Sequence, residues 1–305
     1  MRIFKRILKW LGLTLAVILL LGGAFVAHSW YFKPVNINIF FARAFLQVAL
    51  ESPEMLSTIH VLEQFGIKGH NAELDDDSMA AGDRMFDHLK KSREMLISYA
   101  DEDLSEADRM SKRVAMSLVD MLVEAEKFRF HNYPVNQLFG VQNGFPSFME
   151  STHQVHSVRD AEDYVSRLSQ VGRKFGQVLD GLRHREQLGI LPPQFVVTKV
   201  LEEMRAFVAT PAEEGILMVA LMDKMQEANL PEDEQKRIAL EARGQVENTV
   251  YPAYGELITY FEGLDDKVSE NHGVWALPDG DELYRLAVKL FTTTDYTPEY
   301  LHDYG

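Results

Sequence analysis

The stretch SEADRMSKRVAMSLVDMLVEAEKFRF, residues 105–130, decides the fold class. Its apolar residues recur at steps of three and four, and the clearest of them are Val114, Leu118, Met121, Leu122 and Ala125. This spacing puts them on one side of a helix, so the stretch predicts a long helix with one buried stripe. The segment from Met79 to Tyr99 has the same periodicity. We therefore expect two long antiparallel helices in this part of the chain.

Helix signals continue on both sides of this pair. Three sites carry a capping hydroxyl followed by proline or glutamate: Ser52-Pro53-Glu54, Ser105-Glu106 and Thr297-Pro298-Glu299. Each predicts the start of a helix. Further helices are expected at residues 160–187, 193–208, 213–228, 231–247 and 251–267. No stretch alternates apolar and polar residues for long enough to form a sheet, so the predicted fold is all-α, a multi-helix array of long antiparallel helices.

The segment from Asn132 to His156 is expected to be an ordered loop. It contains several residues that break helices, namely Pro134, Gly140, Gly144 and Pro146. It also offers aromatic residues to a core, namely Phe139, Phe145 and Phe148. The sequence therefore predicts a loop that packs without forming a helix.

The composition limits the possible partners. The chain has 305 residues, of which 46% are hydrophobic, enough for one large helical domain or two small ones. Its net charge is -15, from 31 Lys and Arg against 46 Asp and Glu. A protein that binds nucleic acid through phosphates needs the opposite balance, so nucleic acid is excluded as a partner. The chain has no cysteine, which excludes disulfides, thiolate catalysis and zinc sites built with cysteine.

The N-terminus predicts a membrane segment. Basic residues occupy positions 2, 5, 6 and 9, and an uncharged run from Leu11 to Ala27 follows. A helix from Trp10 to Trp30 would be about 30 Å long, which matches the apolar thickness of a bilayer. Because the basic residues precede this helix, we expect a single-pass anchor in residues 1–32 that contacts the inner membrane through residues 10–30. The domain of residues 33–305 would then be periplasmic or extracellular, with the N-terminus in the cytoplasm.

A cleaved signal peptide is the alternative to a retained anchor. Signal peptides share the basic start and the apolar middle, and Gly22 and Ala24 are small residues suited to a cleavage site. The length of the apolar run favours the anchor. Both alternatives export the rest of the chain.

Two clusters of polar residues raise the possibility of a metal site. His153 and His156 lie three positions apart, but no carboxylate accompanies them at ligand spacing, so hydrogen bonding at the surface is the preferred interpretation. The run Asp75-Asp76-Asp77 lacks the spacing and the turn glycine of a calcium loop. We interpret it as the start of a helix that Asp77 caps. No metal ligand is assigned.

Several motifs along the chain resemble one bacterial family, the domain of unknown function 885. The motifs are Asn136-Gln137-Leu138-Phe139-Gly140, Phe145-Pro146-Ser147-Phe148, Asp160-Ala161-Glu162-Asp163-Tyr164, Ile190-Leu191-Pro192-Pro193-Gln194-Phe195-Val196, Val250-Tyr251-Pro252-Ala253-Tyr254, Gly273-Val274-Trp275-Ala276-Leu277-Pro278-Asp279-Gly280, Tyr284-Arg285 and residues 292–299. Their order and spacing make the resemblance specific, and it runs from about Phe40 to Gly305. It implies a helical fold similar to zinc peptidases of the oligopeptidase type.

The resemblance also implies what this chain lacks. Complete members of the family are about twice as long, and they carry a His-Glu-x-x-His helix that binds zinc in the half that would follow Gly305. None of the ten histidines here begins such a motif. The chain also ends only a few residues after the helix start at Thr297. We therefore expect a truncated domain without catalytic residues, metal ligands or cofactor of its own, with zinc only in the complete family domain.

The segment around Trp275 is the candidate substrate site. Trp275, Asp279, Tyr284 and Arg285 are predicted to line a cleft, where the indole offers apolar area and Arg285 a fork for a peptide carboxylate. The alternative is structural, with Trp275 as a core anchor and Asp279 as a helix cap.

Two functions remain open from the sequence. In the first, the chain is the N-terminal helical part of an exported, membrane-anchored zinc metallopeptidase and is inactive alone. In the second, it is a non-catalytic, membrane-anchored helical module that binds peptides or a partner. The expected partners are the membrane and either peptides or the missing C-terminal half.

Overall fold

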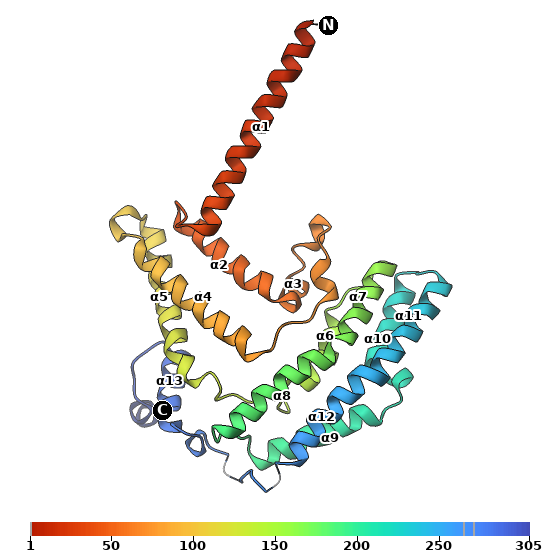
Figure 1. The fold of residues 1–305 in the computed structure, drawn as a ribbon. Coiled ribbons are helices and arrows are strands. Elements are labelled where there is room, and N and C mark those ends of the chain that lie inside the picture. Colours follow the sequence, from red (N-terminus) through yellow and green to blue (C-terminus); the bar gives the residue numbers. More distant parts are fainter. Residues whose placement is uncertain (1, 265, 271) are drawn as a thin grey trace. The chain divides into compact units, whose positions relative to one another are not determined.

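The chain is mainly helical in the residues that the computed structural model describes, which are 2–264, 266–270 and 272–305. No strand occurs among them, so the all-α prediction is confirmed. Figure 1 shows the helices, which are α1 (Arg2–Tyr31), α2 (Ile37–Glu51), α3 (Pro53–Ile59), α4 (Met79–Ser98), α5 (Glu106–Glu124), α6 (Val141–Ser151), α7 (Val158–Ser169), α8 (Val171–Gln187), α9 (Gln194–Ala209), α10 (Ile216–Glu227), α11 (Glu232–Gln245), α12 (Tyr251–Glu262), α13 (Gly280–Thr292) and α14 (Pro298–Tyr304).

Short 3₁₀ turns connect several of these helices. They are η1 (Glu63–Phe65), η2 (Gly69–Ala72), η3 (Asp101–Asp103), η4 (Ala125–Phe128), η5 (Ala212–Glu214) and η7 (Val274–Ala276), while η6 (Val246–Val250) is a π-helical turn between α11 and α12. The predicted caps are present: Ser52, Ser105 and Thr297 each accept a hydrogen bond from a backbone N–H three residues later. At α4, however, the cap is Ser78 and not Asp77.

The chain divides into two compact units, and the first is built around the N-terminal helices. It comprises the residues up to Val48 together with Asp87–Val123, and therefore contains α1, most of α2, the second half of α4 and nearly all of α5. Its core is small and is formed by Ile37, Phe40, Leu96 and Tyr99. Because Arg93 pairs with Asp120 while Lys112 donates to the Tyr99 carbonyl, α4 and α5 run antiparallel, as predicted.

The buried stripe of α5 differs from the predicted one. Val114 and Leu118 are exposed, whereas Ala115, Met116 and Val119 pack against the core of the first unit. The predicted and the observed residues both recur with the period of a helix. The side chains that pack against α2 and α4, however, lie about one position later in the sequence than the predicted ones. The tertiary partners, and not the most apolar residues, decide which side is covered.

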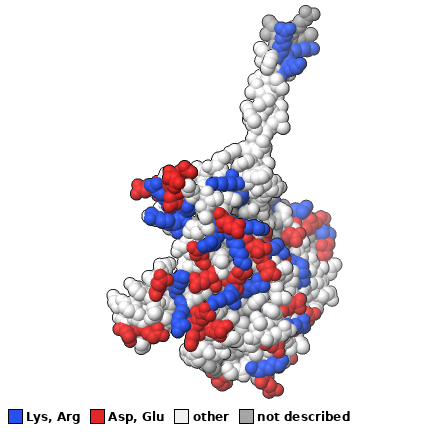
Figure 2. Space-filling model, turned by 60° about the vertical axis from the view of Figure 1, so that its left-hand side comes forward, with Lys and Arg blue, Asp and Glu red and all other residues white. Residues whose placement is uncertain are grey.

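Helix α1 has the features of a membrane segment. Residues Phe4–Tyr31 are long and apolar enough to cross a bilayer, and the most apolar part of this helix is not covered by other parts of the chain. Figure 2 shows this helix as a column without charged side chains, with Lys and Arg at its free end. Where α1 ends, Nη1 of Arg43 donates hydrogen bonds to the carbonyls of Ser29, Trp30 and Phe32. Arg43 therefore satisfies carbonyls that the end of a helix leaves free.

The second unit holds the main core. It comprises Ala49–Phe86 and Glu124–Gly305. Helix α12 packs against α8 and α9, α11 packs against α7 and α10, and α10 also contacts α6. The largest fully buried side chains of this core include Arg167, Tyr164, Tyr254, Phe175 and Phe261. A fully buried arginine among them is unusual, because a charge in a core needs several hydrogen bonds.

The expected loop at residues 132–156 contains a helix, α6, so that prediction was wrong. Pro146 lies inside α6 and lacks the N–H that would bond to the carbonyl of Gln142. The hydroxyl of Tyr254 donates to this carbonyl instead. The helix therefore tolerates its proline because a distant residue supplies the missing donor. Phe145 is buried as expected, whereas Phe139 is 90% exposed.

The expected long helix over residues 160–187 is divided into α7 and α8 at Gln170. The Gln170 side chain donates to the Ala72 carbonyl at 2.6 Å and accepts from the Leu74 N–H at 3.1 Å. These bonds connect the junction to the segment before α4. No proline marks the break, and the nearby Gly172 lies inside α8, so the local sequence did not reveal it.

Candidate functional site

Three motif segments that are far apart in the sequence line one cavity of the second unit, which we call the motif cavity. They contribute Asn136 and Gln137, residues 191–193 with Phe195 and Val196, and Gly273, Val274, Ala276 and Leu277. The cavity has a volume of about 580 Å³. This size is in the range of pockets that bind small molecules or a few residues of a peptide.

Hydrogen bonds and ring contacts hold the walls of the motif cavity together. The Gln194 N–H donates to the Ser269 carbonyl at 3.0 Å, and the rings of Phe195 and His272 meet edge to face at 5.0 Å. On another side, Nε2 of His131 lies 3.0 Å from the Pro278 carbonyl oxygen. The loop that precedes α13 thus contacts both the start of α9 and the turn before α6.

The polar groups of this cavity can form hydrogen bonds with a bound peptide. About half of its lining surface is apolar, and the polar groups are the amides of Asn136 and Gln137, two histidines, a lysine, a tyrosine and a serine. Among the described residues that line it there is no carboxylate. Amide side chains both donate and accept hydrogen bonds, so they can pair with the backbone of an extended peptide.

None of the four predicted cleft residues lines the motif cavity. The side chain of Trp275 is 71% exposed, so it is not a core anchor. Its indole ring lies against Gly273, where a Cβ would come within 2.1 Å of the ring. Only glycine permits this close approach.

The other three candidates belong to the start of α13. Asp279 precedes α13 with a φ of 53°, and its side chain makes no capping hydrogen bond. Tyr284 is half exposed. Arg285 lines a separate cavity of about 360 Å³ together with Glu124, Lys127 and Thr297. The structure therefore does not bring Trp275 and Arg285 into one cavity, and their contact with a substrate stays a prediction.

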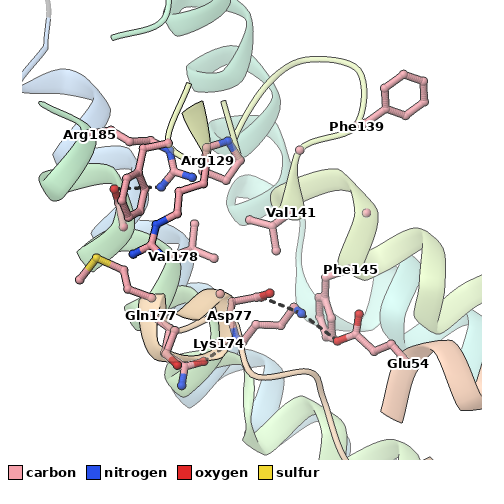
Figure 3. A pocket seen from close by; sticks show the side chains of 18 of the residues that line it. Glu54, Asp77, Arg129, Phe139, Val141, Phe145, Lys174, Gln177, Val178 and Arg185 are labelled. Carbon is pink, nitrogen blue, oxygen red and sulfur yellow. Dashed lines mark hydrogen bonds and ion pairs between the residues drawn. The ribbon is translucent and has the colours of Figure 1, made fainter. Parts of the chain in front are cut away.

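A second cavity, which we call the arginine cavity, lies on the other side of residues 129–141. It has a volume of about 510 Å³ and is lined by parts of α4, α6 and α8. In the view of Figure 3, Arg129 and Arg185 lie together on one side, and Lys174 lies with Asp77 and Glu54 on the other. Val141 and Val178 lie between the two charged groups.

Lys174 forms the centre of one charged group. Its side chain is only 6% exposed, and Nζ lies 2.8 Å from an oxygen of Glu54 and 2.8 Å from an oxygen of Asp77. Burial alone would lower the pKa of Lys174, but the two carboxylates outweigh it and raise the pKa above its usual value. The lysine is therefore charged and fully paired.

Arg129 and Arg185 form the other charged group. Their guanidinium carbons lie 4.6 and 5.3 Å from the centre of the Phe130 ring. Arg129 pairs with Asp83, whereas Arg185 donates to the carbonyl and side-chain oxygens of Asn132 and to the Gly181 carbonyl. Burial lowers the pKa of Arg185, although an arginine stays charged at neutral pH.

Sequence reasoning did not identify the arginine cavity, although a signal was present. Lys174, Gly181 and Arg185 occupy the same helical face as the buried Val178 and Leu182. Basic residues on an otherwise apolar face indicate a charge that is held inside the protein. That pattern distinguishes Lys174 and Arg185 from the exposed arginines of α8.

The histidine pair has a structural role at its first member. His153 is buried and not on the surface, and its Nδ1 accepts a hydrogen bond at 2.7 Å from Nη1 of Arg167. Arg167 also donates to Ser57 and to the carbonyls of His70 and Glu73. The backbone N–H of His156 donates a hydrogen bond to the Asp160 carboxylate. Among the described residues, no three histidine, aspartate or glutamate side chains are placed to hold a metal ion.

Comparison with known proteins identifies the fold and the family. A crystal structure of a candidate lipoprotein from Colwellia psychrerythraea matches with a TM-score of 0.80 and 16% sequence identity. The match covers 88% of this chain and 48% of the other, so the chain spans about half the length of that protein. No curated protein matches the sequence. The model of the family described as "Bacterial protein of unknown function (DUF885)" matches residues 61–305, and the chain therefore belongs to this family.

Proposed function

We propose that the chain is the helical, peptide-binding part of an exported, membrane-tethered metallopeptidase, and that the motif cavity is one wall of its substrate cleft. The observation that carries the proposal is the meeting of three motif segments at one cavity. Apolar walls give affinity for side chains, and the amides of Asn136 and Gln137 can bond to a peptide backbone. The uncovered apolar helix α1 supports tethering or export.

The residues of the motif cavity do not fit a zinc site. Nε2 of His131 is bonded to the Pro278 carbonyl, and His272 packs against Phe195. No third ligand of the kind that zinc needs accompanies them among the described residues. We therefore assign peptide binding, and no chemical step, to this chain, and we expect the chain alone to leave bound peptides intact.

Peptide binding by the full chain in lipid nanodiscs tests this proposal. The probe is a fluorescent apolar tetrapeptide that is acetylated at one end and amidated at the other, so that neither terminus is charged. Leu277→Glu places an unpaired carboxylate in the apolar wall, and we expect it to weaken binding at least about tenfold. Leu240→Glu is the matched control, because Leu240 is exposed on α11 and lies outside this cavity. Equal binding by the two variants would exclude the motif cavity.

A second measurement distinguishes the peptidase proposal from the alternative function, a binding module without any catalytic role. The same peptides are incubated with the full chain and with a second polypeptide of this family that carries a His-Glu-x-x-His helix. Cleavage only in the mixture supports the peptidase proposal. Binding without cleavage in every mixture supports the module.

A further inference from the structure

We propose that the arginine cavity is a separate binding site for a single carboxylate carried on an apolar group. This proposal goes beyond the peptide cleft, because the site uses different residues and recognises a charge. It is built from contacts within the second unit alone.

The first argument is the unbalanced positive charge beside Phe130. The guanidinium groups of Arg129 and Arg185 both lie close to this ring. The carboxylate of Asp83 forms an ion pair with Arg129 and is largely exposed to solvent. Arg185 makes three hydrogen bonds, all to neutral oxygens, and has no carboxylate partner among the described residues. A guanidinium group has five N–H donors, so Arg185 keeps two for a ligand.

The second argument is that these bonds orient Arg185. Its Nε and Nη2 are fixed by Asn132, and its Nη1 by the carbonyl of Gly181 one helical turn earlier. A guanidinium group that is already held in place loses little freedom when it binds a carboxylate. Arg43 and Arg167 are likewise held by neutral acceptors, but of these three arginines only Arg185 lines the arginine cavity.

The third argument defines the ligand. Val141, Val178 and Phe145 form an apolar wall beside the arginines, which suits an aliphatic or aromatic group next to the carboxylate. On the other side of this wall, Lys174 forms ion pairs with both Glu54 and Asp77, so this group has one negative charge in excess. This charge disfavours a second acidic group on the ligand. The site therefore selects a monocarboxylate over a dicarboxylate or a phosphate.

Two natural sources carry this chemistry, namely the free C-terminus of a peptide with an apolar last residue and a free fatty acid. The probes are acetyl-Ala-Ala-Leu as free acid and as amide, and octanoate beside octanol. Binding to the full chain in nanodiscs is measured by calorimetry, with empty nanodiscs subtracted. We expect at least one acid to bind about tenfold to a hundredfold more tightly than its neutral analogue, as is typical of a charge-assisted hydrogen bond. The acid that binds identifies the source.

Two pairs of variants test the location. Arg185→Gln should abolish the preference for the acid, while Arg183→Gln, on the exposed side of the same helix, should keep it. Gly144→Leu should block the cavity, because Gly144 lines it and a Cβ at this position would meet no atom within 4 Å, which leaves room for the leucine side chain. Gly244→Leu is its control, at an equally open position of α11 outside the cavity. Melting curves show that each variant is folded.

The outcomes separate cleanly. Loss of acid binding in Arg185→Gln and Gly144→Leu, with both controls unchanged, supports the site. Equal affinity for acids and neutral analogues, or no binding of either acid by the unaltered chain, overturns it. Leu277→Glu in the motif cavity should leave acid binding unchanged, so failure of the peptide-cleft proposal does not affect this one.

Discussion

The Tyr254 hydroxyl donates a hydrogen bond to the Gln142 carbonyl, which is the acceptor that Pro146 leaves without a donor inside α6. Tyr254 comes from α12, and its ring is buried between Phe175 and Phe207. Proline normally interrupts a helix because it removes one backbone bond and crowds the preceding turn. Here the tertiary structure replaces that bond, so α6 and α12 stabilise one another.

Removing the Tyr254 hydroxyl should therefore destabilise the protein more than an average lost hydrogen bond. We expect Tyr254→Phe to lower the free energy of unfolding by about 1–3 kcal/mol, since the Gln142 carbonyl stays buried without a donor. In the background of Pro146→Ala the same change should cost less, because the new alanine N–H can bond to Gln142. Denaturant titration of the two single variants and the double variant measures this coupling. Strict additivity would contradict the replacement of the proline donor by tyrosine.

His153 should make the stability depend on pH in a defined direction. Its burial, followed by the charge of Arg167, lowers the pKa of His153 to about 3. The unfolded chain takes up a proton near pH 6.5, whereas the folded chain does not until about pH 3. This contribution to stability is thus complete above about pH 6.5 and declines as the pH falls toward 3. The loss between pH 7.5 and pH 5 should be roughly 2 kcal/mol.

Comparison of variants isolates this contribution from that of other groups. His153→Asn keeps a side chain that can accept from Arg167 but does not titrate in this range, so its stability should fall less between pH 7.5 and pH 5. His302→Gln, at an exposed position of α14, should behave like the unaltered chain. A pH dependence shared by all three proteins would show that His153 does not cause it.

The helix caps show how far sequence reasoning succeeds. Ser52, Ser105 and Thr297 cap helices as predicted because a cap depends on residues within one turn. The all-α fold followed from such local signals and from the helical period. Where the structure differs, as at α6 and at Gln170, the deciding contact comes from far along the chain. A single sequence does not show those contacts.

The candidate site was predicted in part for the same reason. The motif around Trp275 was predicted to line a substrate cleft, and its members Val274 and Leu277 line the motif cavity. Trp275 itself was expected either in a cleft or in a core, yet it is exposed. The direction of a side chain in a loop depends on close approaches such as the one at Gly273, which residue type alone does not reveal. The buried cations were missed because their partners lie in other segments.

Lys174 should be essential for stability. Replacing it by methionine leaves Glu54 and Asp77 facing each other without a cation, and both keep partial access to solvent. We expect Lys174→Met to lower the free energy of unfolding by roughly 3 kcal/mol, the lower end of the range for buried pairs. The triple variant with Glu54→Gln and Asp77→Asn should recover much of this loss, because no charge remains unpaired. Lys199→Met, which removes an exposed pair with Glu202, should change stability far less than Lys174→Met.

The last prediction concerns α1, which we expect to remain on the mature protein as a membrane anchor. Its apolar run is long enough to span, and Arg43 holds its end through three carbonyls of the chain. The intact mass of the membrane-bound protein should therefore include residues 1–32, and carbonate washing should not release it. Leu15→Arg with Leu19→Arg should prevent insertion, since each arginine near the centre of a spanning helix costs about 2.5–3.5 kcal/mol. Leu240→Arg, on the exposed surface of α11, should leave the protein in the membrane. A mature chain that begins after Ala24 would instead identify the segment as a cleaved signal peptide.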